Sequence, residues 1–148
     1  MRIVLQRAAY GAVRVDGQIV GEIQGPGLVL LVGIGPHDSE AELRFWAEKC
    51  VNLRIFPDAE GKMNRSLLEV GGAVLAVSQF TLYGETRKGR RPGFSGAAPP
   101  EQAAQHYAQF VEHLRATGVT VATGIFQAHM DVTIHNDGPV TLLLGSDC

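Results

Sequence analysis

The chain has 148 residues, of which 45% are hydrophobic, so we expect one compact domain that spans residues 1–148. The formal net charge of -2 excludes a general attraction to nucleic acid, so any contact with RNA needs a local basic patch. The sequence offers one such patch, Arg87–Arg91, with four cations in five positions. The apolar runs are too short for a signal peptide or a membrane span, which predicts a cytoplasmic protein with no membrane contact.

The two cysteines, Cys50 and Cys148, do not have the spacing of a metal-binding motif. Cys50 falls on the apolar face of an expected helix, where a cysteine behaves as a small buried hydrophobic residue. A chain without a disulfide framework suits a reducing compartment. We therefore expect no disulfide, no metal and no cofactor.

The first half of the chain alternates apolar segments with turn signals, of which Asp16-Gly17 is typical of a hairpin and Gly25–Gly27 of a further turn. Ser39 and Glu42 have the spacing of a capping box, and apolar residues then recur at helical intervals, which predicts a helix. The strands expected in this half are Ile3–Leu5, Ala12–Val15, Gln18–Val20, Leu28–Val32, Leu53–Phe56 and Ala73–Val77.

The second half begins with the segment Gly84–Pro100, which is rich in Gly, Pro and basic residues and has no periodicity. Long unstructured connections are uncommon in compact domains, so we expect a functional loop. A second helix starts at the prolines Pro99 and Pro100 and ends at Gly118. Three further strands are expected at Val119–Thr123, Met130–His135 and Val140–Leu144. Many antiparallel strands with two helices make an α+β domain.

A polar segment, Ser78–Thr81, follows directly on the apolar strand that ends at Val77. A polar group left there without a hydrogen-bond partner would cost roughly 1–3 kcal/mol. The segment is therefore either a strand end whose hydroxyls bond to the backbone or a functional element. No His and Asp partners for Ser78 can be recognised in the sequence, so a catalytic triad is not supported.

The segment Asn136–Pro139 contains four residue types that favour turns, and the simplest interpretation is a turn before a strand. His129, Asp131 and His135 fall on one face of an expected strand, where they could bind a metal. Exposed polar residues of an edge strand are the preferred interpretation of that pattern. The basic run Arg87–Arg91 is either a solvated loop or a contact for phosphate.

At these residues the chain resembles the D-aminoacyl-tRNA deacylase family of the bacterial and eukaryotic type. The resemblance spans nearly the whole chain and depends on two long signatures in the right order, Ser78–Leu82 and Asn136–Thr141. Further matching segments are Gln6-Arg7, Arg54–Phe56, Asp58–Asn64 and Arg91–Ser95.

The resemblance implies a deacylase-type fold with a barrel-like β core, two helices on its outside, and a homodimer with active sites at the subunit interface. It implies hydrolysis of the ester that joins a D-amino acid to the 3′ end of tRNA. The catalytic residues that it implies are Ser78, Gln79, Phe80 and Thr81, and the substrate-binding residues are Arg7, Met130, Gly138 and Pro139.

In the family, the bond that corresponds to Gly138–Pro139 is cis, and the carbonyl groups of these residues project into the partner's pocket. There they would bind the α-ammonium group and exclude an L side chain, whereas glycine mischarged on tRNA-Ala would be accepted. Arg7 resembles the residue that braces this turn, and Met130 the methionine that lines the site. Thr81 is expected to position the ester rather than to attack it, because no neighbouring base is visible.

The segment Phe126–Met130 departs from the family pattern, because Gln127 and His129 replace a small residue and, often, an acid. We expect the exchange to affect substrate range and not the class of activity. Two other hypotheses remain. One is a tRNA-binding module without catalysis that uses Arg87–Arg91 for phosphates, and the other is a metal-dependent hydrolase that uses His129, Asp131 and His135.

Overall fold

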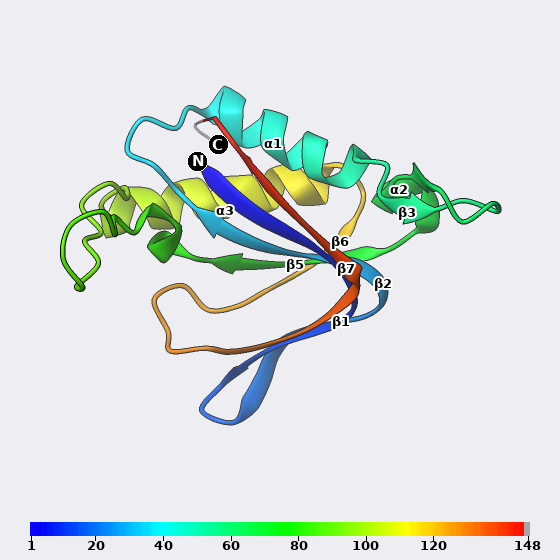
Figure 1. Ribbon diagram of the computed structural model, residues 1–148, viewed down its shortest axis with the longest axis horizontal. Helices are drawn as coiled ribbons and strands as arrows, with labels where there is room; N and C mark the ends of the chain where they lie inside the picture. The colour runs from blue at the N-terminus through cyan, green and yellow to red at the C-terminus, as the bar shows by residue number, and fades with distance from the viewer. Residues whose placement is uncertain (147–148) are drawn as a thin grey trace.

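The computed structural model describes residues 1–146, in which one five-stranded sheet carries helices on one face (Figure 1). The strands of this sheet are β1 (Arg2–Val15), β2 (Gln18–Gly33), β5 (Ala73–Ser78), β6 (Thr120–Thr123) and β7 (Asp131–Gly145). A small hairpin consists of β3 (Phe56–Pro57) and β4 (Met63–Arg65). The helices are α1 (Glu40–Asn52), α2 (Leu67–Val70) and α3 (Pro100–Ala116), and η1 (Phe80–Tyr83) is a short 3₁₀-helix.

The strand order is β6-β5-β2-β1-β7, and the sheet is mixed. Strand β1 pairs antiparallel with β2 and β7, whereas β5 pairs parallel with β2 and β6. The prediction of mainly antiparallel strands is therefore wrong for β5, because α1 and α3 provide the long crossovers that parallel pairing requires. The order leaves β6 and β7 as edges among the described residues, so the sheet is open and a barrel-like core is not seen.

The turn predicted at Gly25–Gly27 lies inside β2, which continues without reversing. Gly25 has a φ of 78°, and the register with β1 shifts between the pairs Ala8–Gly27 and Tyr10–Gln24. Such a shift is a β-bulge, which bends a strand without ending it. The glycine and proline signals therefore indicated a bend where a turn was predicted.

Strand β7 also combines two predicted strands, and Asn136–Pro139 lies within it. On the neighbouring β1, Ala8 pairs with Asn136 while Gln6 pairs with Thr141. The segment Asp137–Val140 is consequently a bulge that faces the single residue Arg7 of β1. The second signature therefore forms a bulge within one strand and not a turn that connects two strands.

Helices α1 and α3 pack against the sheet as their apolar faces predicted (Figure 1). The capping box of α1 is confirmed, because Ser39 Oγ accepts from Glu42 N at 3.2 Å and Glu42 Oε2 accepts from Ser39 N at 2.9 Å. Cys50 is fully buried in this core, as predicted, and burial raises the pKa of its thiol to about 12. Cys148 lies outside the described residues.

Helix α2 was not predicted, and it makes three α-helices where two were expected. It has four residues, too few to show helical periodicity, and Ser66 Oγ caps it by accepting from Glu69 N at 3.2 Å. Within residues 1–146, no helix is both long and apolar enough to cross a membrane.

The opposite face of the sheet carries a second apolar cluster, to which Val29, Leu75 and Val77 contribute. Met130 packs against this cluster from the segment before β7. Val77 of this cluster directly precedes the polar segment Ser78–Thr81.

Candidate active site

A cavity of about 630 Å³ lies where β5 ends. Its walls come from Ser78–Phe80, from Phe94, from the first turn of α3 and from the segment Phe126–Met130. Sites for small molecules commonly have volumes of about 300–1,000 Å³ and combine apolar walls with a few polar groups. The cavity therefore has the size and the lining of a binding site.

The polar segment Ser78–Thr81 is held against β2 at this cavity. Gln79 N donates to the carbonyl oxygen of Val32 at 2.7 Å, which fixes the point where β5 turns into η1. Ser78, Gln79 and Phe80 line the cavity, and Phe80 is 54% exposed. Thr81 adjoins the wall without lining it, and its hydroxyl oxygen accepts a hydrogen bond from Gln79 Nε2. Three of the four residues of the polar segment Ser78–Thr81 thus line the cavity.

Two backbone donors at the start of η1 are left without partners. Leu82 N donates to Gln79 O at 3.2 Å and Gly84 N to Thr81 O at 2.9 Å, as in a 3₁₀ turn. Within residues 1–146, the N–H groups of Phe80 and Thr81 donate to no other group. A first helical turn leaves such donors available to a ligand.

Two glycines at the end of β2 allow η1 to lie this close. A Cβ atom on Gly33 would lie 3.1 Å from Gln79 O, and one on Gly35 would lie 2.5 Å from the hydroxyl oxygen of Tyr83. The two glycines therefore serve close packing.

The segment Phe126–Met130 forms the other wall of the cavity. Gln127 has a φ of 65°, a left-handed conformation that glycine adopts more easily than other residues. Glycine would therefore adopt the backbone conformation of this position with less strain than Gln127 does. A Cβ atom on Gly124 would lie 2.5 Å from Met130 Sδ, so Gly124 makes room for the Met130 side chain.

The bulge of β7 is fixed from both sides. Arg7 Nε donates to Asp137 O at 2.9 Å and Arg7 Nη1 donates to Ile55 O at 2.6 Å. Across the base of the bulge, Val140 N donates to Asn136 Oδ1 at 2.7 Å. The peptide bond between Gly138 and its proline is cis.

Gly138 and Pro139 are exposed, and neither they nor Arg7 line the cavity of the same chain. The structure therefore brings together part of the expected site, namely Ser78–Phe80 with Met130. It leaves the second signature on a separate, exposed bulge.

The metal-site hypothesis has no support in the described part of the chain, residues 1–146, where no group of three or more His, Cys, Asp or Glu residues is placed to hold a metal ion. The ring of His135 packs against that of Tyr10, with 5.2 Å between centroids. Tyr10 in turn donates to Glu22 Oε2 at 2.5 Å, and this hydrogen bond lowers the pKa of Glu22 and raises that of Tyr10.

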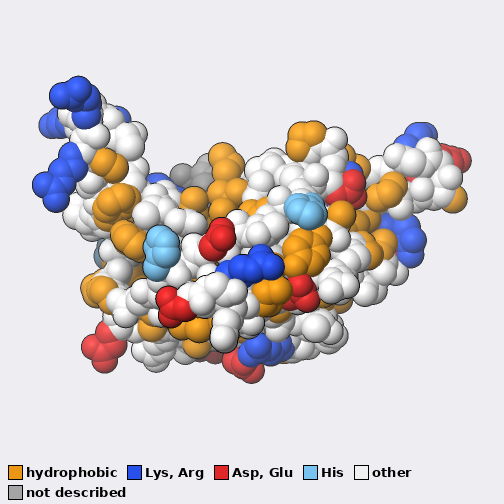
Figure 2. Space-filling model, turned by 90° about the horizontal axis from the view of Figure 1, so that it is seen from below, with side chains coloured by type: hydrophobic (Ala, Val, Ile, Leu, Met, Phe, Trp, Pro, Cys, Tyr) orange, Lys and Arg blue, Asp and Glu red, His pale blue; other side chains and the backbone are white. Residues whose placement is uncertain are grey.

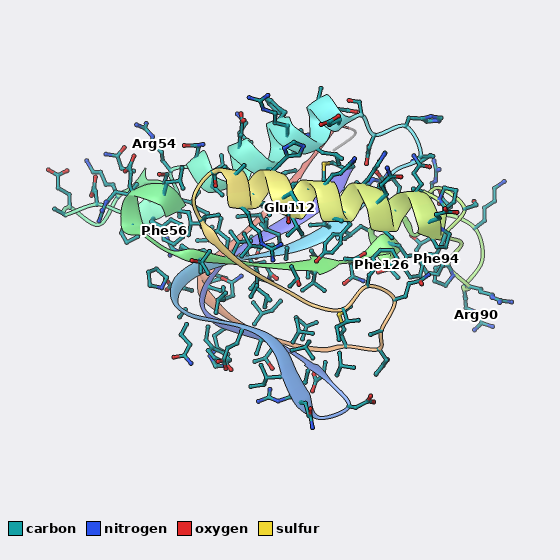
Figure 3. The ribbon with its side chains drawn as sticks, turned by 180° about the vertical axis from the view of Figure 1, so that it is seen from behind. Arg54, Phe56, Arg90, Phe94, Glu112 and Phe126 are labelled. Carbon is teal, nitrogen blue, oxygen red and sulfur yellow. The ribbon has the colours of Figure 1, made fainter. Side chains whose placement is uncertain are left out.

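Two aromatic residues of the cavity were not predicted as site residues. The Phe94 ring meets that of Phe80 edge-on, with 5.2 Å between centroids, and Phe126 lies 6.2 Å from the ring of Tyr107. Figure 3 shows Phe94 and Phe126 beside each other near one end of α3. Phe94 lies in the segment Arg91–Ser95, which matches the family, and Phe126 begins the segment that departs from the family pattern. Aromatic residues in such irregular segments could have indicated a role outside the core.

Comparison with known proteins identifies the family of the chain. A family model described as D-Tyr-tRNA(Tyr) deacylase matches residues 4–145. The D-aminoacyl-tRNA deacylase of Symbiobacterium thermophilum is 58% identical, covering 99% of this chain and 97% of the relative. The D-aminoacyl-tRNA deacylase of Heliobacterium modesticaldum is 60% identical, covering 97% and 95%.

Two solved structures share this fold over nearly the whole chain. A structure described as the c-Myc DNA unwinding element binding protein has a TM-score of 0.91 and 41% identity, covering 99% of both chains. A structure described as a probable eukaryotic D-amino acid tRNA deacylase has a TM-score of 0.79 over 97% of both chains, and at 20% identity it supports the fold alone.

The sequence matches place the protein in the hydrolase class of enzymes. The chain belongs to the D-Tyr-tRNA(Tyr) deacylase family.

Proposed function

We propose that the protein hydrolyses the ester bond between a D-amino acid and the 3′-terminal adenosine of tRNA. The observation that carries the proposal is the position of Ser78–Phe80, which line a cavity of about 630 Å³ beside two unpaired backbone N–H groups. The sequence relatives, whose names describe this reaction, support the same assignment.

The N–H groups of Phe80 and Thr81 would stabilise the reaction's charged intermediate. Water adds to the ester carbonyl carbon, and negative charge develops on the carbonyl oxygen, where these donors can bind it. When the intermediate collapses, the bond to the ribose oxygen breaks and that oxygen takes up a proton. The products are the free D-amino acid and tRNA.

Thr81 is proposed to position the ester. Its hydroxyl oxygen accepts from the Gln79 side-chain amide, and an amide is no base that could remove the hydroxyl proton. We propose that the neighbouring 2′-hydroxyl of the ribose assists the attacking water instead. The rings of Phe80 and Phe94 at the cavity offer apolar surfaces on which a nucleobase can stack.

We further propose that Gly138 and Pro139 act in the cavity of a second subunit of a homodimer. In one chain the bulge is exposed, lies outside the cavity and is held by Arg7, which suits a rigid group that reaches into a partner. The two carbonyl groups would bind the α-ammonium group and leave no room for an L side chain. Glycine mischarged on tRNA-Ala would pass this selection.

The proposed reaction concerns translation, so the cytoplasm is the expected location. We also propose that residues 1–148 act as one catalytic domain. The reaction as proposed uses D-aminoacyl-tRNA as substrate and has no step that requires a metal or other cofactor.

The test compares release of tyrosine from D-Tyr-tRNA and from L-Tyr-tRNA, with Gly-tRNA-Ala as a third substrate. Hydrolysis of the D ester alone among the tyrosyl esters supports the proposal, and equal rates on both enantiomers reject it. Salt-sensitive tRNA binding without turnover would favour a binding module. An inert glycyl ester would remove the glycine activity, and full activity in a monomer at equilibrium would remove the proposed dimeric site.

A further inference from the structure

The basic loop, Gly84–Gly96, projects from one end of the molecule. Figure 2 shows Lys and Arg side chains gathered on the projection at the upper left. The protein as a whole has a net charge of -2, so this concentration of positive charge is local. A local patch of this kind attracts a polyanion to one place on the surface.

The base of the basic loop is fixed by its own residues. Glu85 N donates to Gly93 O at 2.7 Å, and Gly93 N donates to Glu85 O at 3.0 Å. The Glu85 carboxylate also accepts from Arg87 N at 2.8 Å and from Arg87 Nε at 2.9 Å. The charge of Arg87 is therefore paired with Glu85 within the loop.

The remaining cations of the basic loop have no such partner. Lys88, Arg90 and Arg91 are exposed, and within residues 1–146 none of them forms an ion pair. Three unpaired cations thus lie on a loop whose two ends are joined at the base by the backbone hydrogen bonds between Glu85 and Gly93. They lie within four positions of the sequence.

The basic loop is connected to the cavity at its base. Phe94 lines the cavity and contacts Phe80, and a Cβ atom on Gly84 would lie 3.3 Å from the Phe94 ring. Figure 3 shows Arg90 pointing outward beyond Phe94 at the same end of the molecule. A ligand that leaves the cavity past the two phenylalanine rings therefore enters the field of the loop.

We propose that Lys88, Arg90 and Arg91 bind backbone phosphates of the RNA strand whose 3′ end occupies the cavity, and that Arg87 only shapes the loop. The inference rests on the proposed deacylase function. A cation that binds a backbone phosphate does not contact the bases, so the loop should bind tRNAs of different sequence with similar affinity. Every phosphate neutralised releases a bound counterion, which makes the binding sensitive to salt.

The experiment combines Lys88→Ala, Arg90→Ala and Arg91→Ala in one variant. A control with Lys49→Ala, Arg54→Ala and Lys62→Ala removes the same charge from exposed residues elsewhere. Figure 3 places Arg54 at the opposite end of the molecule from Arg90. Both variants are assayed on D-Tyr-tRNA and on D-tyrosyl-adenosine over a series of salt concentrations, and their Kd values for uncharged tRNA are measured.

The loop variant is expected to raise KM for D-Tyr-tRNA about tenfold relative to the control and to lower the slope of log Kd against log salt by about two. The loss on D-Tyr-tRNA should exceed the loss on D-tyrosyl-adenosine by about the same factor. Equal losses on the two substrates, or a tRNA Kd within about twofold of the control at each salt concentration, would overturn the inference. Failure of the wild type on both esters would instead reject the deacylase proposal, while the tRNA Kd still decides the phosphate contact.

Discussion

Arg7 Nε donates a hydrogen bond of 2.9 Å to the carbonyl oxygen of Asp137, in the bulge that faces Arg7 across the sheet. The same guanidinium donates to Ile55 O at 2.6 Å, and its side chain is only 11% exposed. One nearly buried cation therefore connects the bulge of β7 to the segment that precedes β3. The Asp137 carboxylate lies 3.5 Å from Arg7 Nε and adds an ion pair.

Arg7→Lys is expected to loosen the bulge. A lysine keeps the charge but has no planar fork, so it cannot hold both carbonyl oxygens in the present geometry. Loss of one charged hydrogen bond lowers the free energy of unfolding by about 2 kcal/mol, and we expect the ratio of D to L hydrolysis to fall about tenfold. Urea unfolding at fixed protein concentration and paired D- and L-Tyr-tRNA assays measure the two effects.

Arg14→Lys, on the same strand, is the matched control and should change neither quantity appreciably. If Arg7→Lys lowered stability while the D to L ratio stayed at its wild-type value, Arg7 would be a structural residue only. The proposed part of the bulge in chiral selection would then lose its support.

Thr81→Ala is expected to lower kcat without abolishing it. The substitution removes the hydroxyl that accepts from Gln79, and one hydrogen bond of about 1 kcal/mol corresponds to a rate change of about fivefold. Thr81→Ser keeps the hydroxyl and should recover most of the rate. Complete loss in the alanine variant, with an acyl adduct on the wild type by intact-mass spectrometry, would show that Thr81 is a nucleophile.

Gln127→Gly is expected to stabilise the protein. Gln127 has a φ of 65°, and relief of that conformation gains about 1–2 kcal/mol, from which the greater chain entropy of glycine subtracts about 0.5–1 kcal/mol. A net gain of about 0.5–1 kcal/mol should appear in urea unfolding.

The neighbouring Ala128→Gly variant provides the contrast for Gln127→Gly. Ala128 does not have a positive φ, so glycine there brings only the entropy loss and should destabilise by about 0.5–1 kcal/mol. Equal destabilisation by both glycines would mean that the conformation of Gln127 carries no strain.

Local signals predicted local structure well. The capping box of Ser39 and Glu42 marked the start of α1, and the apolar run from Ala73 marked β5. A continuous apolar strand that is buried on both faces is typical of a parallel sheet, so the run itself favoured the parallel pairing of β5 that was not predicted. Which strands β5 pairs with depends on the path of the crossovers, which local sequence does not specify. The segment Gly25–Gly27 was misread because a positive φ serves a bulge as well as a turn.

The site could be predicted in part. Ser78–Phe80 and Met130 were named from the resemblance, and the structure brings them to one cavity. The fit of Arg7 between Asp137 and Ile55 depends on the register of β1 with β7, which no sequence period specifies across a bulge. Phe94 reaches the cavity through tertiary contacts alone, so its place required the fold.

The Glu85–Arg87 pair at the base of the basic loop should persist in mild acid. The hydrogen bond from the Arg87 side chain, followed by that from its backbone N–H, lowers the pKa of Glu85 from 4.5 to about 2. Because the folded value is the lower one, the contribution of this pair to loop order is present above the unfolded value and is lost as pH falls through about 2. The pair should therefore persist at about pH 3, where ordinary glutamates are protonated.

A carbon-13 NMR titration of the Glu85 carboxyl measures this midpoint directly. Arg87→Ala removes the side-chain donors but keeps the backbone N–H, so the Glu85 midpoint should move part of the way back toward its ordinary value of 4.5. If the wild type titrates near 4.5 as well, the Glu85–Arg87 pair does not persist in solution. Arg87 would then be free to join Lys88 and Arg90 on phosphate, and the assignment of a purely shaping role to Arg87 would fail.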